Sequence, residues 1–188
     1  FSFLPGVEEI NKESDIQEYD LAIALDCANI KLLNGFAKYF DNAKVKVAID
    51  HHSSNTMYAD YNYINQDSPA CAQLLLVAFS YFGIEVTKEI GTCILAGIIT
   101  DTGGFRYSTV TAETFRFVAE LCEKGVKVSQ VYDRVFSNKT RAKFELHRIA
   151  LERIEFLEEG KIAYTYITKA DEEKVGAENG DYDGIVEN

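Results

Sequence analysis

The chain has 188 residues, enough for one full domain or for a domain with an appendage. Hydrophobic residues make up 47% of it and charged residues 26%, as in soluble globular proteins. Its formal net charge of −11 argues against a broad basic surface, so we expect no binding to long duplex nucleic acid. A phosphate substrate is not excluded, because metal ions held by carboxylates reverse the local field. No apolar run reaches the roughly 18–20 residues that a membrane span needs, so we expect no membrane partner.

The four cysteines lie far apart and form no CxxC pair; they are Cys27, Cys71, Cys93 and Cys122. In a chain of this size, that pattern predicts buried free thiols in a reducing compartment rather than disulfides or zinc ligands. We therefore expect a cytoplasmic protein. Cys27 follows Asp26 directly, but we interpret it as a small apolar neighbour rather than as a catalytic thiol.

The first half of the chain predicts a βαβ unit. Residues 20–26 form a short apolar run closed by Asp26, and residues 44–49 form a second such run that leads into Asp50. Residues 29–40 between them predict a helix. A right-handed crossover brings Asp26 and His51 to the same edge of a parallel sheet. The inner side of the predicted helix consists of Leu32, Leu33, Phe36, Ala37 and Phe40.

The later elements follow from the same patterns. We expect, in order, a loop at 53–55, a strand at 58–64, helices at 70–82 and 87–99, a turn at 101–104 and a helix at 111–124. Residues 87–99 also suit a strand, but the polar residues at their start favour a helix. Residues 139–158 predict a long amphipathic helix and residues 162–167 a strand, followed by an acidic tail. The apolar side of the long helix carries Phe144, Ala150, Leu151, Ile154 and Leu157.

Three apolar runs end in side chains that can bind metal. Asp26 closes one run, the triplet Asp50-His51-His52 closes the second, and Asp101 follows the third, at 94–99. Each acid alone is more often a cap or a turn residue, but three in this order are much less expected by chance. Because open α/β sheets place their sites at the carboxyl edge, the pattern predicts a site for a hard or borderline divalent cation.

With these motifs in place, the chain resembles the DHH superfamily of phosphoesterases, in its oligoribonuclease and pAp-phosphatase (nano-RNase) branch. The matching segments are ALDCAN, AIDHHSSN (48–55) and AGIITDTGGFRYST (96–109), and the similarity extends over residues 1–168. The resemblance implies an α/β fold with a parallel sheet flanked by helices. It also implies a manganese-dependent hydrolase of short single-stranded RNA or of 3′-phosphoadenosine 5′-phosphate (pAp).

The resemblance also implies roles for single residues. Asp26 and Asp101 would each bridge two Mn²⁺ ions and His51 would ligate one, with Mg²⁺ or Co²⁺ as open alternatives. His52 would face the substrate phosphate, and Asp50 would orient the histidine pair. Two metal ions clamp the attacking and leaving oxygens of an in-line displacement and generate hydroxide near neutral pH.

Secondary candidates lie beside these motifs. Asn55 and Arg106 follow the family pattern as substrate-binding residues, and Arg106 suits a bidentate phosphate clamp. Gly103 and Gly104 would let the backbone approach the metal ions. His147, on the long helix, is interpreted as a packed helix residue rather than as a ligand.

The resemblance further implies that the chain is incomplete. The family's first motif, a His-x-x-x-Asp-x-Asp-like segment with three more ligands, is missing from this sequence. We expect a DHH domain at 1–138, a linker helix at 139–160 and, at 161–188, the start of a C-terminal DHHA1-like substrate domain that is largely absent. The parent protein would be the enzyme, and this chain alone would be weakly active or inactive. A homodimer is left open.

Three other functions stay open. Cleavage of cyclic dinucleotides is a close variant of the leading function. A family II pyrophosphatase or an exopolyphosphatase is a sibling, against which the segment from Asp101 to Tyr107 argues. A non-catalytic DHH module that senses nucleotides is the alternative from a different class.

Overall fold

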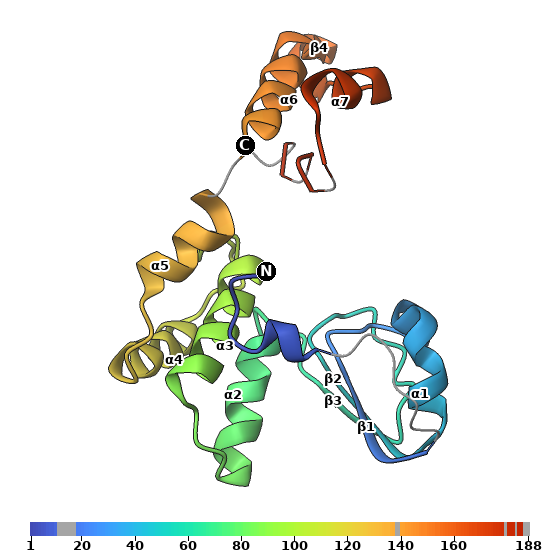
Figure 1. Ribbon diagram of the computed structural model, residues 1–188, viewed down its shortest axis with the longest axis vertical. Helices are drawn as coiled ribbons and strands as arrows, with labels where there is room; N and C mark the ends of the chain where they lie inside the picture. The colour runs from blue at the N-terminus through green and yellow to red at the C-terminus, as the bar shows by residue number, and fades with distance from the viewer. Residues whose placement is uncertain (11–17, 138–139, 179, 183, 186–188) are drawn as a thin grey trace. The chain divides into compact units, whose positions relative to one another are not determined.

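The computed structural model describes residues 1–10, 18–137, 140–178, 180–182 and 184–185. The chain forms two compact units, Phe1–Val135 and Phe136–Asn188, and Figure 1 shows the elements of each. Within the described residues, no helix has both the length and the apolar character required to cross a membrane.

The first unit contains a parallel sheet of three strands in the order β1-β2-β3. They are β1 (Tyr19–Leu25), β2 (Ala43–Asp50) and β3 (Tyr61–Ile64). Leu25 pairs with Ile49 and Asp50 pairs with Ile64, so the strands end at one common edge. The parallel pairing of β1 with β2 confirms the predicted strands and the βαβ connection between them. Helices flank the sheet, as the expected α/β fold class requires.

The connection from β1 to β2 differs from the predicted single helix over 29–40. It consists of a 3₁₀ segment, η2 (Ile30–Phe36), followed by a short α1 (Ala37–Asp41). Asn34, with φ 48° and ψ −128°, interrupts the helical backbone. Of the expected inner side chains, Phe40 is buried, whereas Leu32 and Phe36 are half exposed, so this part of the prediction was wrong.

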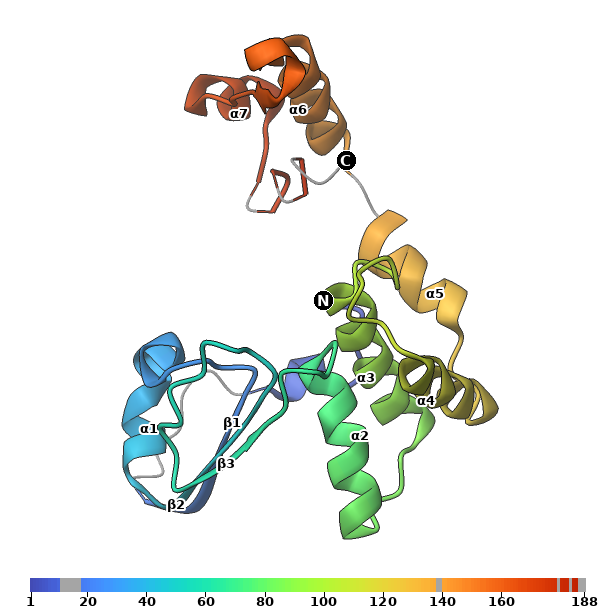
Figure 2. The same ribbon diagram turned by 180° about the vertical axis from the view of Figure 1, so that it is seen from behind.

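The helices of the first unit follow the prediction closely. They are α2 (Cys71–Phe82), α3 (Lys88–Asp101) and α4 (Ala112–Glu123). The short α5 (Val128–Tyr132) and the π-helix at Asp133–Ser137 after it were not predicted. Figure 2 shows α2, α3 and α4 side by side, in agreement with their contacts. The side chains of Leu95, Ile98, Ile99 and Leu121 are fully buried between them.

Helices α2 and α3 approach each other closely at Gly97. A Cβ atom on Gly97 would lie 2.7 Å from the Cβ of Ala72, so only glycine fits at this crossing. The side chain of Thr87 accepts a hydrogen bond from the Ile90 amide at the start of α3, and the helix continues to Asp101. Residues 87–99 are therefore helical, and Asp101 stands at the C-terminus of a helix rather than at a strand end.

The second unit contains α6 (Arg141–Glu152), β4 (Glu155–Leu157), η4 (Glu158–Gly160), β5 (Ile162–Tyr164) and α7 (Lys169–Val175). The predicted helix over 139–158 was too long, because its second part is the first strand of a β4–β5 hairpin. Three consecutive residues with positive φ, Glu158, Glu159 and Gly160, make the turn. The acidic tail after residue 167 includes α7, while residues 139, 179, 183 and 186–188 lie outside the described residues.

The buried face of α6 also differs from the prediction. Leu146, Ile149 and Ala150 are buried, whereas Phe144 and Leu151 are exposed. Leu146 and Ala150 form a core with Ile185, against which Ile167, Val175 and Ala177 pack. The predicted linker helix is therefore part of a packed unit.

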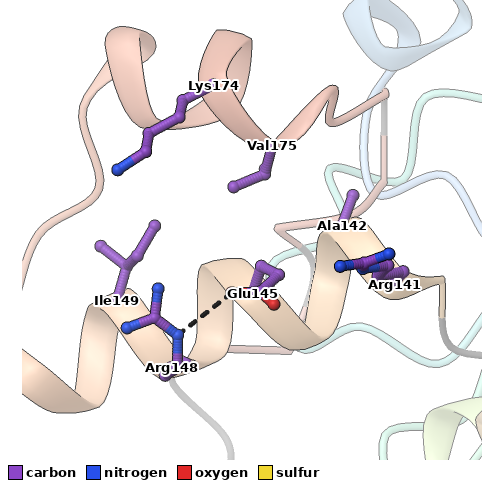
Figure 3. A pocket seen from close by; sticks show the side chains of 7 residues that line it. All are labelled: Arg141, Ala142, Glu145, Arg148, Ile149, Lys174 and Val175. Atoms are coloured by element: carbon purple, nitrogen blue, oxygen red, sulfur yellow. Dashed lines mark hydrogen bonds and ion pairs between the residues drawn. The ribbon is translucent and has the colours of Figure 1, made fainter.

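The two helices of the second unit are joined by a bidentate ion pair and separated by a groove. The Arg153 guanidinium donates to both oxygens of Asp171, which caps α7 together with Thr168. A cavity of about 420 Å³ lies between α6 and α7. Figure 3 shows the side chains that line it, among them Arg148 and Glu145. The Arg148 guanidinium donates to the Glu145 carboxylate at 3.1 Å. Its lining consists of Arg141, Ala142, Glu145, Arg148, Ile149, Lys174 and Val175.

Candidate metal centre

Asp26 and the histidine pair meet at the carboxyl edge of the sheet. The Oδ1 atom of Asp26 lies 3.4 Å from Nε2 of His51 and 3.7 Å from Nδ1 of His52. Asp26 follows β1 in a left-handed conformation (φ 57°), and its amide donates to the carbonyl of Ile49 at 3.0 Å. One ligand atom from each of the three side chains lies within 4.8 Å of the others.

Asp101 approaches the same cluster from the end of α3. Its Oδ2 atom lies 3.7 Å from Nε2 of His51, so this nitrogen faces two carboxylates. Burial raises the pKa of Asp101, and the charge of Asp26 raises it further, although both histidines oppose the shift. The site therefore concentrates negative charge that a cation would neutralise.

The ring of His51 has a fixed orientation. Its Nδ1 atom lies 3.1 Å from the carbonyl oxygen of Ser68, which can only accept, so Nδ1 carries a proton. In the neutral ring, Nε2 then offers its lone pair toward Asp26 and Asp101, the usual arrangement of a metal-ligating histidine. In the metal-free protein, the hydrogen bond with Asp26 raises the pKa of His51; burial lowers it, and the Ser68 carbonyl and the charge of Asp101 add to the rise.

Asp50 lies beneath the histidines with no solvent exposure. Its Oδ1 accepts from the His51 amide at 2.8 Å and lies 2.7 Å from Nδ1 of His52, while its Oδ2 accepts from Nδ2 of Asn55 at 2.7 Å. Burial alone would raise the pKa of Asp50, but these donors outweigh it and the pKa is lowered. Asp50 thus contacts the ring of His52 and the backbone amides of both histidines, and its role in orienting the pair stays a prediction.

Asn55 and Arg106, which were predicted to bind substrate, differ in their surroundings. The side-chain Nδ2 atom of Asn55 donates to Asp50 and, at 3.2 Å, to the carbonyl of Cys27, so this side chain joins two loops of the protein. The side chain of Arg106 is exposed on the turn that follows Asp101. Substrate binding by these two residues stays a prediction.

The glycine turn after Asp101 makes room for an aromatic ring. A Cβ atom on Gly103 would lie 2.6 Å from Cζ of Tyr107, and its φ is +57°. Glycine at position 103 thus leaves room for the ring of Tyr107. A different reason for this glycine was expected from the sequence, namely a close approach of the backbone to metal ions. His147 lies on α6 in the second unit and is half-buried, as a packed helix residue should be.

The cysteines near the site are not poised as nucleophiles. Cys71 donates to the carbonyl of Ile49, and burial raises its pKa to about 12. Burial also raises the pKa of Cys27, and Asp26 and Asp50 add to the effect. All four cysteines are free thiols, but Cys122 is exposed, so the prediction that all are buried was wrong.

An apolar cavity of about 310 Å³ adjoins the side chains of Asp26 and Asp101. It opens between the end of β1, helices α2 and α3, and the start of the chain. Its lining consists of Phe1, Leu4, Leu25, Asp26, Cys71, Ala72, Leu75, Cys93, Ala96, Gly97, Thr100 and Asp101.

The fold and the site define an α/β protein with carboxylates and imidazoles gathered at the carboxyl edge of a parallel sheet. A family model described as "DHH family, N-terminal domain" matches residues 3–98, about half of the sequence. The chain belongs to the DHH family, which confirms the resemblance drawn from its motifs.

Known relatives carry more specific names. A bifunctional oligoribonuclease and PAP phosphatase NrnA of Thermus thermophilus is 38% identical over 89 residues, 47% of this chain and 28% of that protein. The Bacillus subtilis protein of the same name is 25% identical over 178 residues, 93% of this chain and 55% of that protein. The chain therefore spans about half or less of the length of these two relatives.

A solved structure shares the fold. The crystal structure of an exopolyphosphatase-related protein from Bacteroides fragilis superposes with a TM-score of 0.91 at 22% sequence identity. The match covers 98% of this chain and 58% of that chain. At this identity, the likeness establishes the fold alone.

Proposed function

We propose that this chain carries the metal centre of a phosphohydrolase that acts on short oligoribonucleotides or on pAp. The observation that carries the proposal is the convergence of Asp26, His51 and Asp101, with Nε2 of His51 facing both carboxylates. Membership of the DHH family and the oligoribonuclease and PAP phosphatase names of its relatives support this substrate class.

The donor set fits divalent cations. Carboxylate oxygens of Asp26 and Asp101 and the Nε2 atom of His51 would hold the ions, for which the imidazole favours Mn²⁺ over Mg²⁺. When bound, such ions activate water near neutral pH and neutralise charge on phosphate. The hydrogen bond between Ser68 and Nδ1 of His51 keeps the ligating nitrogen aimed at the carboxylates.

The remaining residues of the site would act on the substrate. His52 is half exposed, and because its Nδ1 bonds to Asp50, its Nε2 is the nitrogen available to a phosphate oxygen. The guanidinium of Arg106 would bind phosphate through two parallel hydrogen bonds. In this scheme Asp50 neither binds metal nor touches substrate, but keeps the orientation of His52.

The proposal is tested with the full product of the gene that encodes this chain. With Mn²⁺ present, we would assay pAp, RNA of two to five nucleotides, cyclic dinucleotides and pyrophosphate. An Asp101→Ala variant is the control. Hydrolysis of short RNA or pAp that the variant loses would support the proposal. A preference for cyclic dinucleotides or pyrophosphate would identify one of the alternative functions, and metal binding without turnover of any substrate would favour a sensing module.

A further inference from the structure

Hydrogen bonds tie two loops together at the carboxyl edge of the sheet. One loop, residues 26–28, carries Asp26, and the other, residues 55–58, follows the histidine pair. The Thr56 amide donates to the carbonyl of Ala28 at 2.8 Å. The side-chain Nδ2 atom of Asn55 and the hydroxyl of Tyr58 both donate to the carbonyl of Cys27, at 3.2 Å and 3.1 Å. The peptide group one residue beyond Asp26 therefore receives two side-chain hydrogen bonds.

These hydrogen bonds flank Asp26, whose backbone has an unusual conformation. Its φ of 57° is a left-handed conformation that residues other than glycine adopt rarely. Such a conformation persists only where its surroundings enforce it. The Asp26 amide is bound to Ile49 on one side, and the Cys27 carbonyl is held on the other. Together these bonds determine the direction in which the Asp26 carboxylate leaves the backbone.

Tyr58 is well placed for this role. Its ring packs against the buried Phe40 with 5.5 Å between the ring centroids, so the hydroxyl projects from a fixed platform. Burial raises the pKa of Tyr58 to about 12, to which the nearby Cys27 and Asp50 also contribute. The hydroxyl therefore keeps its proton and acts as a donor. Phenylalanine at this position would retain the ring packing and lose only the hydrogen bond to Cys27.

We propose that Tyr58 is a positioning residue for Asp26, holding the left-handed turn after β1 so that the carboxylate faces His51. Without the hydroxyl, the Cys27 carbonyl keeps one of its two side-chain donors, and the turn gains freedom to relax toward an ordinary backbone conformation. The Asp26 carboxylate would then spend less time near Nε2 of His51. This inference rests on the proposed function only where Asp26 is taken to hold a metal ion.

The test compares Tyr58→Phe with Tyr61→Phe in this 188-residue chain. Tyr61 lies on β3 and is 67% exposed, so the control removes a hydroxyl without touching the turn. Amide hydrogen exchange of Asp26 is measured without metal, and Mn²⁺ affinity is measured by electron paramagnetic resonance. We expect Tyr58→Phe to speed exchange at Asp26 several-fold and to weaken Mn²⁺ binding about tenfold, the usual effect of losing a residue that supports a ligand. The Tyr61→Phe variant should match the wild type in both measurements.

Three results would overturn the proposal. The first is unchanged exchange at Asp26 in Tyr58→Phe, and the second is an equal effect of Tyr61→Phe. The third is faster exchange over the whole sheet, including Ala48, which would mean that the hydroxyl has only a general structural role. If the 188-residue chain binds no Mn²⁺, the affinity comparison is made with the full product of the gene, and the exchange at Asp26 still decides the role of Tyr58.

Discussion

Asp50 and His52 are joined by a 2.7 Å contact between Oδ1 and Nδ1, although Asp50 is fully buried and the His52 side chain is 46% exposed. An exposed imidazole ordinarily samples several rotamers. Here the ring is anchored to a carboxylate that is itself held by Asn55 and by the His51 amide. The buried charge thus fixes the orientation of a group that faces solvent.

Replacing Asp50 by Asn should destabilise the fold by about 1.5–3 kcal/mol, the range for hydrogen bonds to a charged group. The amide keeps the shape of the carboxylate, but its NH₂ group faces donors and leaves them unpaired. Because the pKa of Asp50 is lowered in the folded state, its carboxylate stabilises the fold above about pH 4, and this contribution is lost as the pH falls further. Urea denaturation at several pH values measures both effects.

The control for Asp50 is Asp20→Asn. Asp20 is exposed and pairs with Lys44 at the surface, so its loss should change the unfolding free energy by less than about 1 kcal/mol. Equal losses in the two variants would contradict a special role for the buried carboxylate.

Replacing His51 by Ala should weaken Mn²⁺ binding at least about tenfold, because the variant removes the nitrogen that faces both Asp26 and Asp101. His147→Ala is the matched control, since this histidine lies on α6 in the second unit. Isothermal titration with Mn²⁺ measures both affinities. Retained affinity in His51→Ala would exclude this residue as a ligand.

Metal binding should strengthen as the pH rises through the pKa of His51. Protons and metal ions compete for Nε2, and this pKa lies above its ordinary value of about 6.5, first because of the hydrogen bond with Asp26. In the metal-free protein the sign is opposite: protonated His51 stabilises the fold at low pH, and the contribution is lost as the pH rises through the raised pKa. Mn²⁺ titrations and metal-free melting curves over the same pH range should therefore have opposite trends.

The sequence predicted the part of the site that depends on strand ends. Asp26 and His51 meet because parallel strands finish at one edge, and apolar runs closed by these residues reveal that edge. The carbonyl of Ser68 and the hydroxyl of Tyr58 could not be predicted in the same way. A backbone acceptor has no signature in the sequence, and the direction of a tyrosine hydroxyl depends on packing against a residue as distant as Phe40.

The fold could be predicted from the sequence where the spacing of apolar residues matched only a helix or only a strand. Residues 70–82 and 111–124 have clear helical patterns and a glycine after their ends, and both form helices. Residues 153–158 suit the apolar stripe of a helix equally well, yet Glu155–Leu157 pair with β5. That pairing depends on the left-handed turn at 158–160, where two of the three residues are glutamates that give no turn signal.

Truncating Leu146 to Ala should destabilise the second unit by about 2–5 kcal/mol, because the side chain is fully buried and leaves a cavity. Leu151→Ala is the matched control on the same helix. Leu151 is 57% exposed, so its truncation should cost less than about 0.5 kcal/mol. Urea denaturation, together with hydrogen exchange at the α6 amides, measures the loss of stability in each variant. A larger loss in Leu151→Ala than in Leu146→Ala would favour the buried helix face that the sequence pattern predicts.

Replacing Gly103 by Ala tests the turn that carries Arg106. The positive φ alone costs alanine about 1–2 kcal/mol, and the new methyl group would also collide with the ring of Tyr107. Gly83→Ala isolates the first cost, because Gly83 has a φ of +66° and a methyl group added there would meet nothing within 4 Å. Chemical denaturation should therefore show a larger loss for Gly103→Ala than for Gly83→Ala. In the double variant Gly103→Ala/Tyr107→Ala, the loss of stability should be smaller than the sum of the two single losses, because the ring that the methyl group meets is absent. If the losses simply add, Tyr107 moves aside without cost.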